Sequence, residues 1–199
     1  MAKANDHEVV SIYPFSEAQI DKLMTLAPEC VLNWTTKDGW PVGVVHSFVW
    51  DKGHVWITFA AHRHRAAAIK RDPRVSVVVS GAPSRNPDCP RGQATIKGTA
   101  VFHEDEAIKK DFYRKLSKKG FPDNKAGEDD FYSLLDSPLR TVLEVTPVKW
   151  ITFDADKSSR HRQGTIDPSE LGEMKSSDAV RMNRERAARG LPPRTSKDS

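Results

Sequence analysis

The strongest constraint on the fold is a series of three strand-like segments joined by short turns in the first third of the chain. Residues 30–36, 42–50 and 54–60 are rich in β-branched and aromatic side chains, as strands usually are. Asp38-Gly39 separates the first two segments, and residues 51–53 separate the last two. Both connections have the residues typical of hairpin turns, so this region predicts three antiparallel strands in sequence.

The middle of the chain continues this pattern with one helix and two further strands. Residues 65–71 contain three consecutive alanines and predict a short helix, which Asp72-Pro73 ends because a residue before proline avoids helical geometry. Residues 75–80 predict a Val-rich strand, and residues 93–104 a long one with Gly98 at a bulge or corner. Three prolines and two glycines indicate that residues 81–92 form a loop.

The last predicted strands are residues 140–148 and 149–153. About six strands in hairpin order suggest a mainly β protein, a closed or nearly closed barrel with a few flanking short helices (α+β by content). A β-sandwich with the same number of strands would give a similar pattern.

Three further segments have helical patterns. Ser16 to Gln19 reads as a capping box, and the apolar residues after it share one helical face up to Pro28. Residues 105–118 predict a helix, and residues 129–135 a weaker one. The side chains expected on the core-facing side of the first of these are Ala107, Ile108, Phe112 and Leu116.

The end of the chain differs from the rest in composition. After Asp154 the sequence is polar and charged, and its scattered apolar residues show no core-forming pattern. The overall apolar content of 38% lies below the globular average of about 45–50%, as expected when part of a chain does not pack. We therefore expect an N-terminal helical segment (1–28), a barrel domain (29–153) and a charged C-terminal arm or disordered tail (154–199), helical near 178–189.

Composition also bears on location and partners. With 31 basic against 27 acidic residues, the net charge of +4 does not indicate nucleic-acid binding, although it allows one site for an anionic ligand. No stretch approaches the roughly 18–20 apolar residues of a membrane span, and the N-terminus lacks a signal-peptide pattern. Two distant cysteines fit a reducing compartment. We expect a soluble, cytoplasmic protein without nucleic-acid or membrane partners.

The segment most suited to chemistry is residues 58–65, which passes from a strand into the short helix. A helix start exposes free amides and a partial positive charge, which favour phosphate. Arg63 and Arg65 add guanidinium groups, and Thr58 adds a hydroxyl donor. This combination predicts a site for a dianion, the alternative being a solvated basic turn.

Five short sequence motifs occur in a characteristic order along residues 27–153. They are Asp38-Gly39-Trp40-Pro41, Thr58, His64-Arg65, residues 68–75 and Gly98-Thr99-Ala100. Their order resembles that of the flavin-binding split barrels related to pyridoxamine 5'-phosphate oxidase. The resemblance implies a six-stranded antiparallel split β-barrel and a homodimer with two cofactors between the subunits.

The resemblance also implies which residues hold the cofactor. In that family the basic residue opening the short helix binds the cofactor phosphate, a position that corresponds to Arg65, with His64 or Arg63 assisting. Residues of the second strand line the flavin ring and ribityl chain, and a third-strand hydroxyl corresponds to Thr58. The implied cofactor-binding residues are Val45, His46, Ser47, Thr58, Arg63, His64 and Arg65.

The implied function is an FMN-dependent oxidoreductase that transfers hydride to or from a small-molecule substrate. Alternatives are an F420-dependent reductase of the same fold, a non-catalytic flavin- or haem-binding module, and a plain nucleic-acid- or partner-binding barrel. The family's vitamin B6 oxidase signature does not align with Trp150 and the tail, so the substrate is not implied. No carboxylate–histidine dyad is evident, no catalytic residue is assigned, and no metal is expected, because His62 and His64 lack a third ligand.

Overall fold

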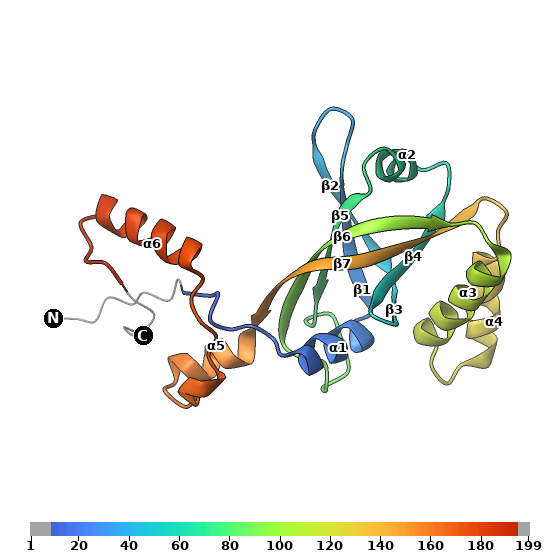
Figure 1. Ribbon diagram of the computed structural model, residues 1–199. Helices are drawn as coiled ribbons and strands as arrows, with labels where there is room; N and C mark the ends of the chain where they lie inside the picture. The colour runs from blue at the N-terminus through green and yellow to red at the C-terminus, as the bar shows by residue number, and fades with distance from the viewer. Residues whose placement is uncertain (1–8, 195–199) are drawn as a thin grey trace. The chain divides into compact units, whose positions relative to one another are not determined.

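The computed structural model describes residues 9–194 (Figure 1). The chain divides into two compact units. The larger unit is Glu17–Ile151, and the smaller unit combines the residues before Glu17 with those from Thr152 onward. Contacts therefore group the first helix with the sheet, whereas the sequence pattern placed it in a separate N-terminal segment. The division at 1–28, 29–153 and 154–199 stays a prediction.

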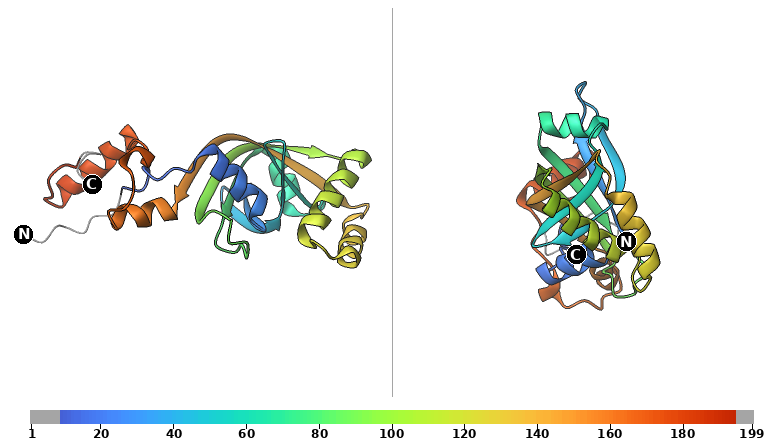
Figure 2. Two further views of the ribbon diagram at one scale, coloured as in Figure 1. Left: turned by 90° about the horizontal axis from the view of Figure 1, so that it is seen from below. Right: turned by 90° about the vertical axis from the view of Figure 1, so that its right-hand side faces the viewer.

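Seven strands form one mainly antiparallel sheet. The strands are β1 (Glu29–Thr35), β2 (Pro41–Ser47), β3 (Val49–Asp51), β4 (His54–Ala60), β5 (Arg74–Ser80), β6 (Gly92–His103) and β7 (Arg140–Asp154). Their order across the sheet is β2-β1-β5-β6-β7-β4-β3. The outermost strands, β2 and β3, are separated in the chain by Phe48 alone, so the sheet curls into a half-barrel whose two edges are joined at that residue (Figures 1 and 2).

The mainly β, barrel-like architecture was predicted, and the prediction of about six strands compares with seven in the sheet. The predicted strand 42–50 is interrupted at Phe48: its first part pairs with β1 and its second part with β4. The two parts stand at opposite ends of the strand order, so they form the two edges of the sheet. Conversely, the two segments predicted at 140–148 and 149–153 are one continuous strand, β7.

The interior of the half-barrel is filled by alternating residues of each strand, because successive side chains of a strand point to opposite faces. Phe48, at the joint between the two edges, is wholly buried. The other large interior side chains are Leu32, Trp34, Val55, Ile57, Phe59, Val75, Val77, Val79, Ile96, Leu143 and Val145.

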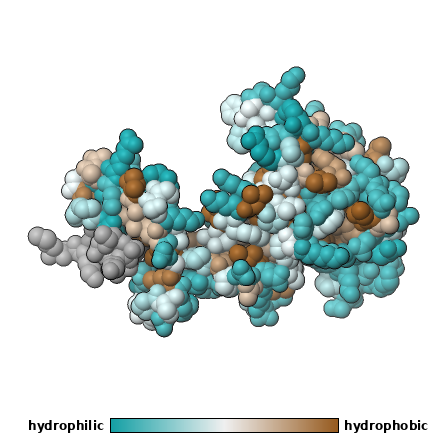
Figure 3. Space-filling view, in the orientation of Figure 1, coloured by the Kyte–Doolittle hydropathy of each residue, from teal (hydrophilic) through white to brown (hydrophobic). Residues whose placement is uncertain are grey.

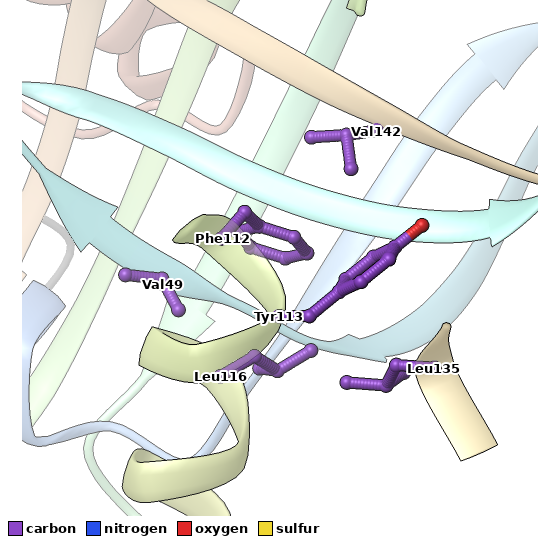
Figure 4. Packing of buried hydrophobic residues seen from close by; sticks show 6 residues of the cluster. All are labelled: Val49, Phe112, Tyr113, Leu116, Leu135 and Val142. Carbon is purple, nitrogen blue, oxygen red and sulfur yellow. The ribbon is translucent and has the colours of Figure 1, made fainter. Parts of the chain in front are cut away.

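Four helices belong to the larger unit: α1 (Glu17–Leu26), α2 (His64–Arg71), α3 (Glu106–Gly120) and α4 (Lys125–Leu135). The Asp105 side chain caps α3 by accepting hydrogen bonds from the amides of Ala107 and Ile108. α3 and α4 cover a second hydrophobic cluster on the other face of the sheet (Figure 4). Its buried members are Val49, Phe112, Tyr113, Leu116, Leu135 and Val142.

One detail of α3 differs from the prediction. Phe112 and Leu116 are buried as expected, but Ala107 and Ile108 are exposed. The buried face of α3 begins only at Lys109, so the first turn lies beyond the side chains that pack on the sheet. The visible surface of this unit is mainly hydrophilic, with isolated hydrophobic residues (Figure 3).

The smaller unit contains α5 (Ala155–Arg162), the short 3-10 helix η1 (Pro168–Glu170) and α6 (Ser176–Ala188). Its core consists of Val9, Ile12 and Tyr13. Four apolar side chains pack against them: Phe153, Leu171, Met174 and Met182. The sequence pattern had suggested no core here, because these contacts join the two ends of the chain. Within residues 9–194, no helix has the length and apolar content needed to cross a membrane.

Candidate functional site

Arg65, the second residue of α2, lies in an aromatic cage. Its guanidinium carbon is 5.6 Å from the ring centroid of Trp34 in β1 and 5.3 Å from that of Phe59 in β4. Nε and Nη1 of Arg65 are buried and have no hydrogen-bond partner. Burial, and then the positive charge of Arg63, lower the pKa of the Arg65 guanidinium. Buried donors without a partner are costly, so these two N–H groups favour an acceptor brought by a ligand.

His46 of β2 reaches the same place. Its ring centroid lies 5.8 Å from that of Phe59, and its Nε2 is buried without a hydrogen-bond partner. Burial lowers the pKa of His46 to about 4, and the charge of Arg65 adds to this shift. His46 is therefore neutral at pH 7, and its unpartnered nitrogen donates or accepts a hydrogen bond according to the tautomer.

The start of α2 adds two more cationic or polar side chains. Arg63 occupies the N-cap position in an extended conformation and makes no side-chain capping bond. Arg63 and His64 are both exposed. The first turn of α2 contains no acidic residue, so the helix start keeps its positive character.

The remaining predicted site residues point elsewhere. The buried hydroxyl of Thr58 donates a hydrogen bond to the carbonyl of Thr141 at 2.8 Å. Because neighbours in a strand face opposite sides, Thr58 faces away from Phe59 and the Arg65 cage. Val45 and Ser47 alternate with His46 in the same way, and both are exposed.

The structure thus brings Arg65 and His46 together around Phe59, with Arg63 and His64 at the adjacent helix start. It does not bring Val45, Ser47 or Thr58 to that point within the chain. The assignment of all seven residues to a cofactor stays a prediction.

Sequence reasoning missed Trp34 and Phe59 as site residues. Trp34 was one of four tryptophans crowded into the first strands and had no distinguishing signal. Phe59 stands next to Thr58, and strand alternation places it on the side of the sheet that Thr58 does not face. Their role is to surround the guanidinium with low-dielectric walls, which strengthen its interaction with an anion.

The structure also contains a cluster of two histidines and one carboxylate that the sequence pattern did not indicate. Glu144 of β7 holds His103 Nε2 at 2.6 Å and His54 Nδ1 at 2.8 Å, and His103 stacks on Trp56. In the described part of the chain, no three His, Cys, Asp or Glu side chains are arranged to hold a metal ion. The cluster involves none of the residues around Arg65.

The Arg65 neighbourhood suits a phosphate or another anionic oxygen group. Guanidinium N–H groups, a neutral imidazole and a helix start all supply hydrogen bonds or positive potential. The fit rests on geometry as well as on residue types, because nitrogen atoms of Arg65 and His46 are buried without hydrogen-bond partners.

The chain is similar to known proteins in sequence and in fold. The family model for pyridoxamine 5'-phosphate oxidase matches residues 17–154. Among solved structures, a conserved hypothetical protein from Mycobacterium tuberculosis has a TM-score of 0.62 at 16% identity, over 84% of this chain and 97% of its own. No curated protein matches the chain.

Two further solved structures show the range of the fold. An F420 reductase has a TM-score of 0.50 at 20% identity, over 69% of this chain and 98% of its own. The haem storage protein HutZ from Vibrio cholerae has a TM-score of 0.53 at 13% identity, over 69% of this chain and 93% of its own. At these identities the likeness concerns the fold alone.

Proposed function

The chain belongs to the pyridoxamine 5'-phosphate oxidase family, and from that membership we propose that it is an FMN-dependent oxidoreductase acting on a small-molecule substrate. The observation that carries the proposal is the guanidinium of Arg65, caged by Trp34 and Phe59 with Nε and Nη1 unpartnered. When bound, the flavin supplies hydride transfer, and the protein supplies its position and electrostatic environment.

Each residue around Arg65 has a distinct part in this proposal. Arg65 donates hydrogen bonds to the cofactor phosphate, and the start of α2 with Arg63 and His64 adds positive potential. His46, neutral at pH 7 because burial lowers its pKa to about 4, offers one hydrogen bond without adding charge. Trp34 and Phe59 exclude water from the guanidinium, which makes its interaction with the phosphate stronger than at an open surface.

The roles proposed for Val45, Ser47 and Thr58 differ from those of the residues around Arg65. We propose that Val45 and Ser47, exposed on β2, meet a flavin held between two copies of the chain, as the family's homodimeric arrangement implies. Thr58 then acts indirectly, since its hydroxyl is committed to the Thr141 carbonyl and steadies the strand that carries Phe59. A cytoplasmic location is part of the same proposal and suits the two free cysteines.

The deazaflavin F420 is the second candidate cofactor. It is favoured by the additional exposed cation at Arg63, which could hold a longer anionic tail, and an F420 reductase shares the fold. A flavin- or haem-binding module without turnover is the third candidate, since HutZ also shares the fold.

The first test is a spectroscopic titration of the purified chain with FMN and with F420. We expect Arg65→Ala to weaken binding of the preferred cofactor about 10- to 100-fold, because one hydrogen bond to a charged group contributes about 1.5–3 kcal/mol. Arg85→Ala, which removes an exposed cation in the loop before β6, is the matched control and should bind as the wild type does. Equal affinity in the wild type and Arg65→Ala would remove Arg65 from the cofactor site.

A second measurement separates an enzyme from a binding module. Under anaerobic conditions, the bound cofactor is mixed with NADH or NADPH and then with an electron acceptor, and its absorption is followed. Reduction and reoxidation over repeated cycles support an oxidoreductase. A cofactor that binds but never cycles with any donor tested supports the module instead.

A further inference from the structure

A cavity of about 500 Å³ lies beside the joint between β2 and β3. Its wall comes from the end of α1, the Ser47–Phe48 joint, Asn86 in the loop before β6, and α3 and α4 with their connection. Most of the wall is apolar, with Leu26, Phe48, Leu116 and Phe131 as its largest side chains. A cavity of this size and character falls within the range of about 300–1,000 Å³ typical of small-molecule sites.

Lys119 is the one charged side chain on the described wall of this cavity. Its Nζ is buried, has no hydrogen-bond partner, and rests 4.0 Å from the ring centroid of Phe48. A contact with an aromatic face replaces only part of the hydration that a buried ammonium loses. The ammonium therefore lacks a counter-charge.

The buried thiol of Cys30 does not supply that counter-charge. Burial lowers the pKa of Lys119 to about 8, against a small opposing influence of the thiols of Cys30 and Cys89. Burial also raises the pKa of Cys30 to about 12, so this thiol is neutral at pH 7. Lys119 is mainly protonated at that pH, and the neutral Cys30 thiol does not balance its charge.

We propose that this cavity binds a small organic carboxylate with an apolar body, whose negative charge pairs with Lys119. The apolar wall contacts the body of the ligand, and the flexible stem of Lys119 turns its ammonium from the Phe48 ring toward the carboxylate. A monoanion suits the site better than a phosphate dianion, because a single cation would leave the second charge unpaired in an apolar enclosure.

The carboxylate site shares only Ser47 with the proposed flavin site. None of Arg65, Trp34 and Phe59 lies on the cavity wall. Ser47, which does line it, faces the opposite side of β2 from His46. The inference therefore goes beyond the proposed function and does not depend on it.

The test compares octanoate with octanol, two probes that share an apolar body and differ in charge. Binding to the full chain is measured by isothermal titration calorimetry. We expect the wild type to bind octanoate roughly ten-fold or more tighter than octanol, the scale of one charged contact. Lys119→Met should bind the two probes equally, while Lys118→Met, which removes the exposed neighbouring cation, should keep the preference.

Three results would overturn the proposal. One is equal affinity of the wild type for both probes, and another is an equal loss in Lys118→Met. The third is a loss of octanoate binding in Arg65→Ala that parallels its loss of FMN, because the two sites would then be one.

A measurement on the wild type covers the case in which Lys119→Met does not fold. Lys119 is modified by reductive methylation with and without octanoate, and its labelling is read by mass spectrometry. Octanoate should slow labelling of Lys119 several-fold and leave Lys118 unchanged. Unchanged labelling of Lys119 at saturating octanoate would exclude contact between the two.

Discussion

At the scale of single residues, two cations are buried against aromatic rings without a hydrogen-bond partner at the atoms concerned. Arg65 lies between Trp34 and Phe59, and Lys119 lies on Phe48. Aromatic faces offset part of the lost hydration, but a buried charge without a counter-ion still costs folding free energy. Such costs are tolerated where a ligand recovers them, which is why both proposed sites are built on these residues.

Lys119→Met should stabilise the unliganded protein at pH 7 by roughly 1–3 kcal/mol, since it removes a desolvated charge and keeps the apolar stem volume. Its pKa is lowered from 10.5 to about 8 in the folded state, so between these pH values the unfolded chain binds more protons. Wild-type stability therefore gains a contribution as the pH rises through this window.

Urea denaturation of the wild type, Lys119→Met and Lys118→Met between pH 7 and the upper end of this window measures both effects. Only Lys119→Met should lose the contribution, while Lys118→Met should follow the wild type. A Lys119→Met variant less stable than the wild type at pH 7 would mean that the contact with Phe48 outweighs the desolvation of the ammonium.

At the scale of elements, strands β6 and β7 approach closely at Gly98. A Cβ at this position would lie 2.5 Å from Cγ1 of Val145 and 2.8 Å from the carbonyl oxygen of Thr146. The pairing of β5 with β6 runs through Gly98 without an extra residue, so the glycine serves a close approach and the predicted bulge is absent from this pairing.

Gly98→Ala should therefore destabilise the sheet by roughly 1–3 kcal/mol, the usual cost of overpacking a filled interior. Gly120→Ala is the control, because its Cβ would meet only atoms of Phe131 at 3.7 Å or more. Thermal unfolding followed by circular dichroism compares the two variants. A Gly98→Ala midpoint equal to that of Gly120→Ala would show that β7 shifts at no cost.

At the scale of the whole molecule, the sheet curls until its two edges meet at Phe48, and several aliphatic side chains on its strands stay exposed. Val45 of β2, Val101 of β6 and Val148 of β7 are 56%, 51% and 73% exposed. Single exposed aliphatic side chains are common on protein surfaces, so these valines provide positions at which a dimer can be tested. The proposal of a dimer that shares its cofactors rests on the homodimeric arrangement of the family.

We expect analytical ultracentrifugation to give a dimer whose FMN content is one per chain. Val148→Glu should weaken the dimer and the flavin affinity together, because it places a charge on an apolar contact. Leu134→Glu replaces a side chain of α4 that is 64% exposed and should leave both unchanged. A wild-type monomer that binds FMN tightly would contradict a site shared between subunits.

Much of this protein follows from the sequence by itself, because its signals are local. Turn residues such as Asp38-Gly39 and Asp72-Pro73 end strands and helices within a few residues, and the predicted elements at β1, β4, α2 and β5 lie within about two residues of the observed ones. The same local chemistry identified the start of α2 as an anion-binding candidate, since Arg63 to Arg65 are consecutive in the chain.

Tertiary structure decided what depends on partners distant in sequence. The apolar pattern of residues 42–50 is continuous, and only the pairing of its two parts with β1 and β4 reveals the break at Phe48. Three features depend on side chains from separate elements. They are the contacts of Arg65 and His46 with Phe59, the lack of a hydrogen-bond partner at Lys119 Nζ, and the Glu144–His103 pair. Packing determines which donors stay without a partner, and no single segment of sequence contains that information.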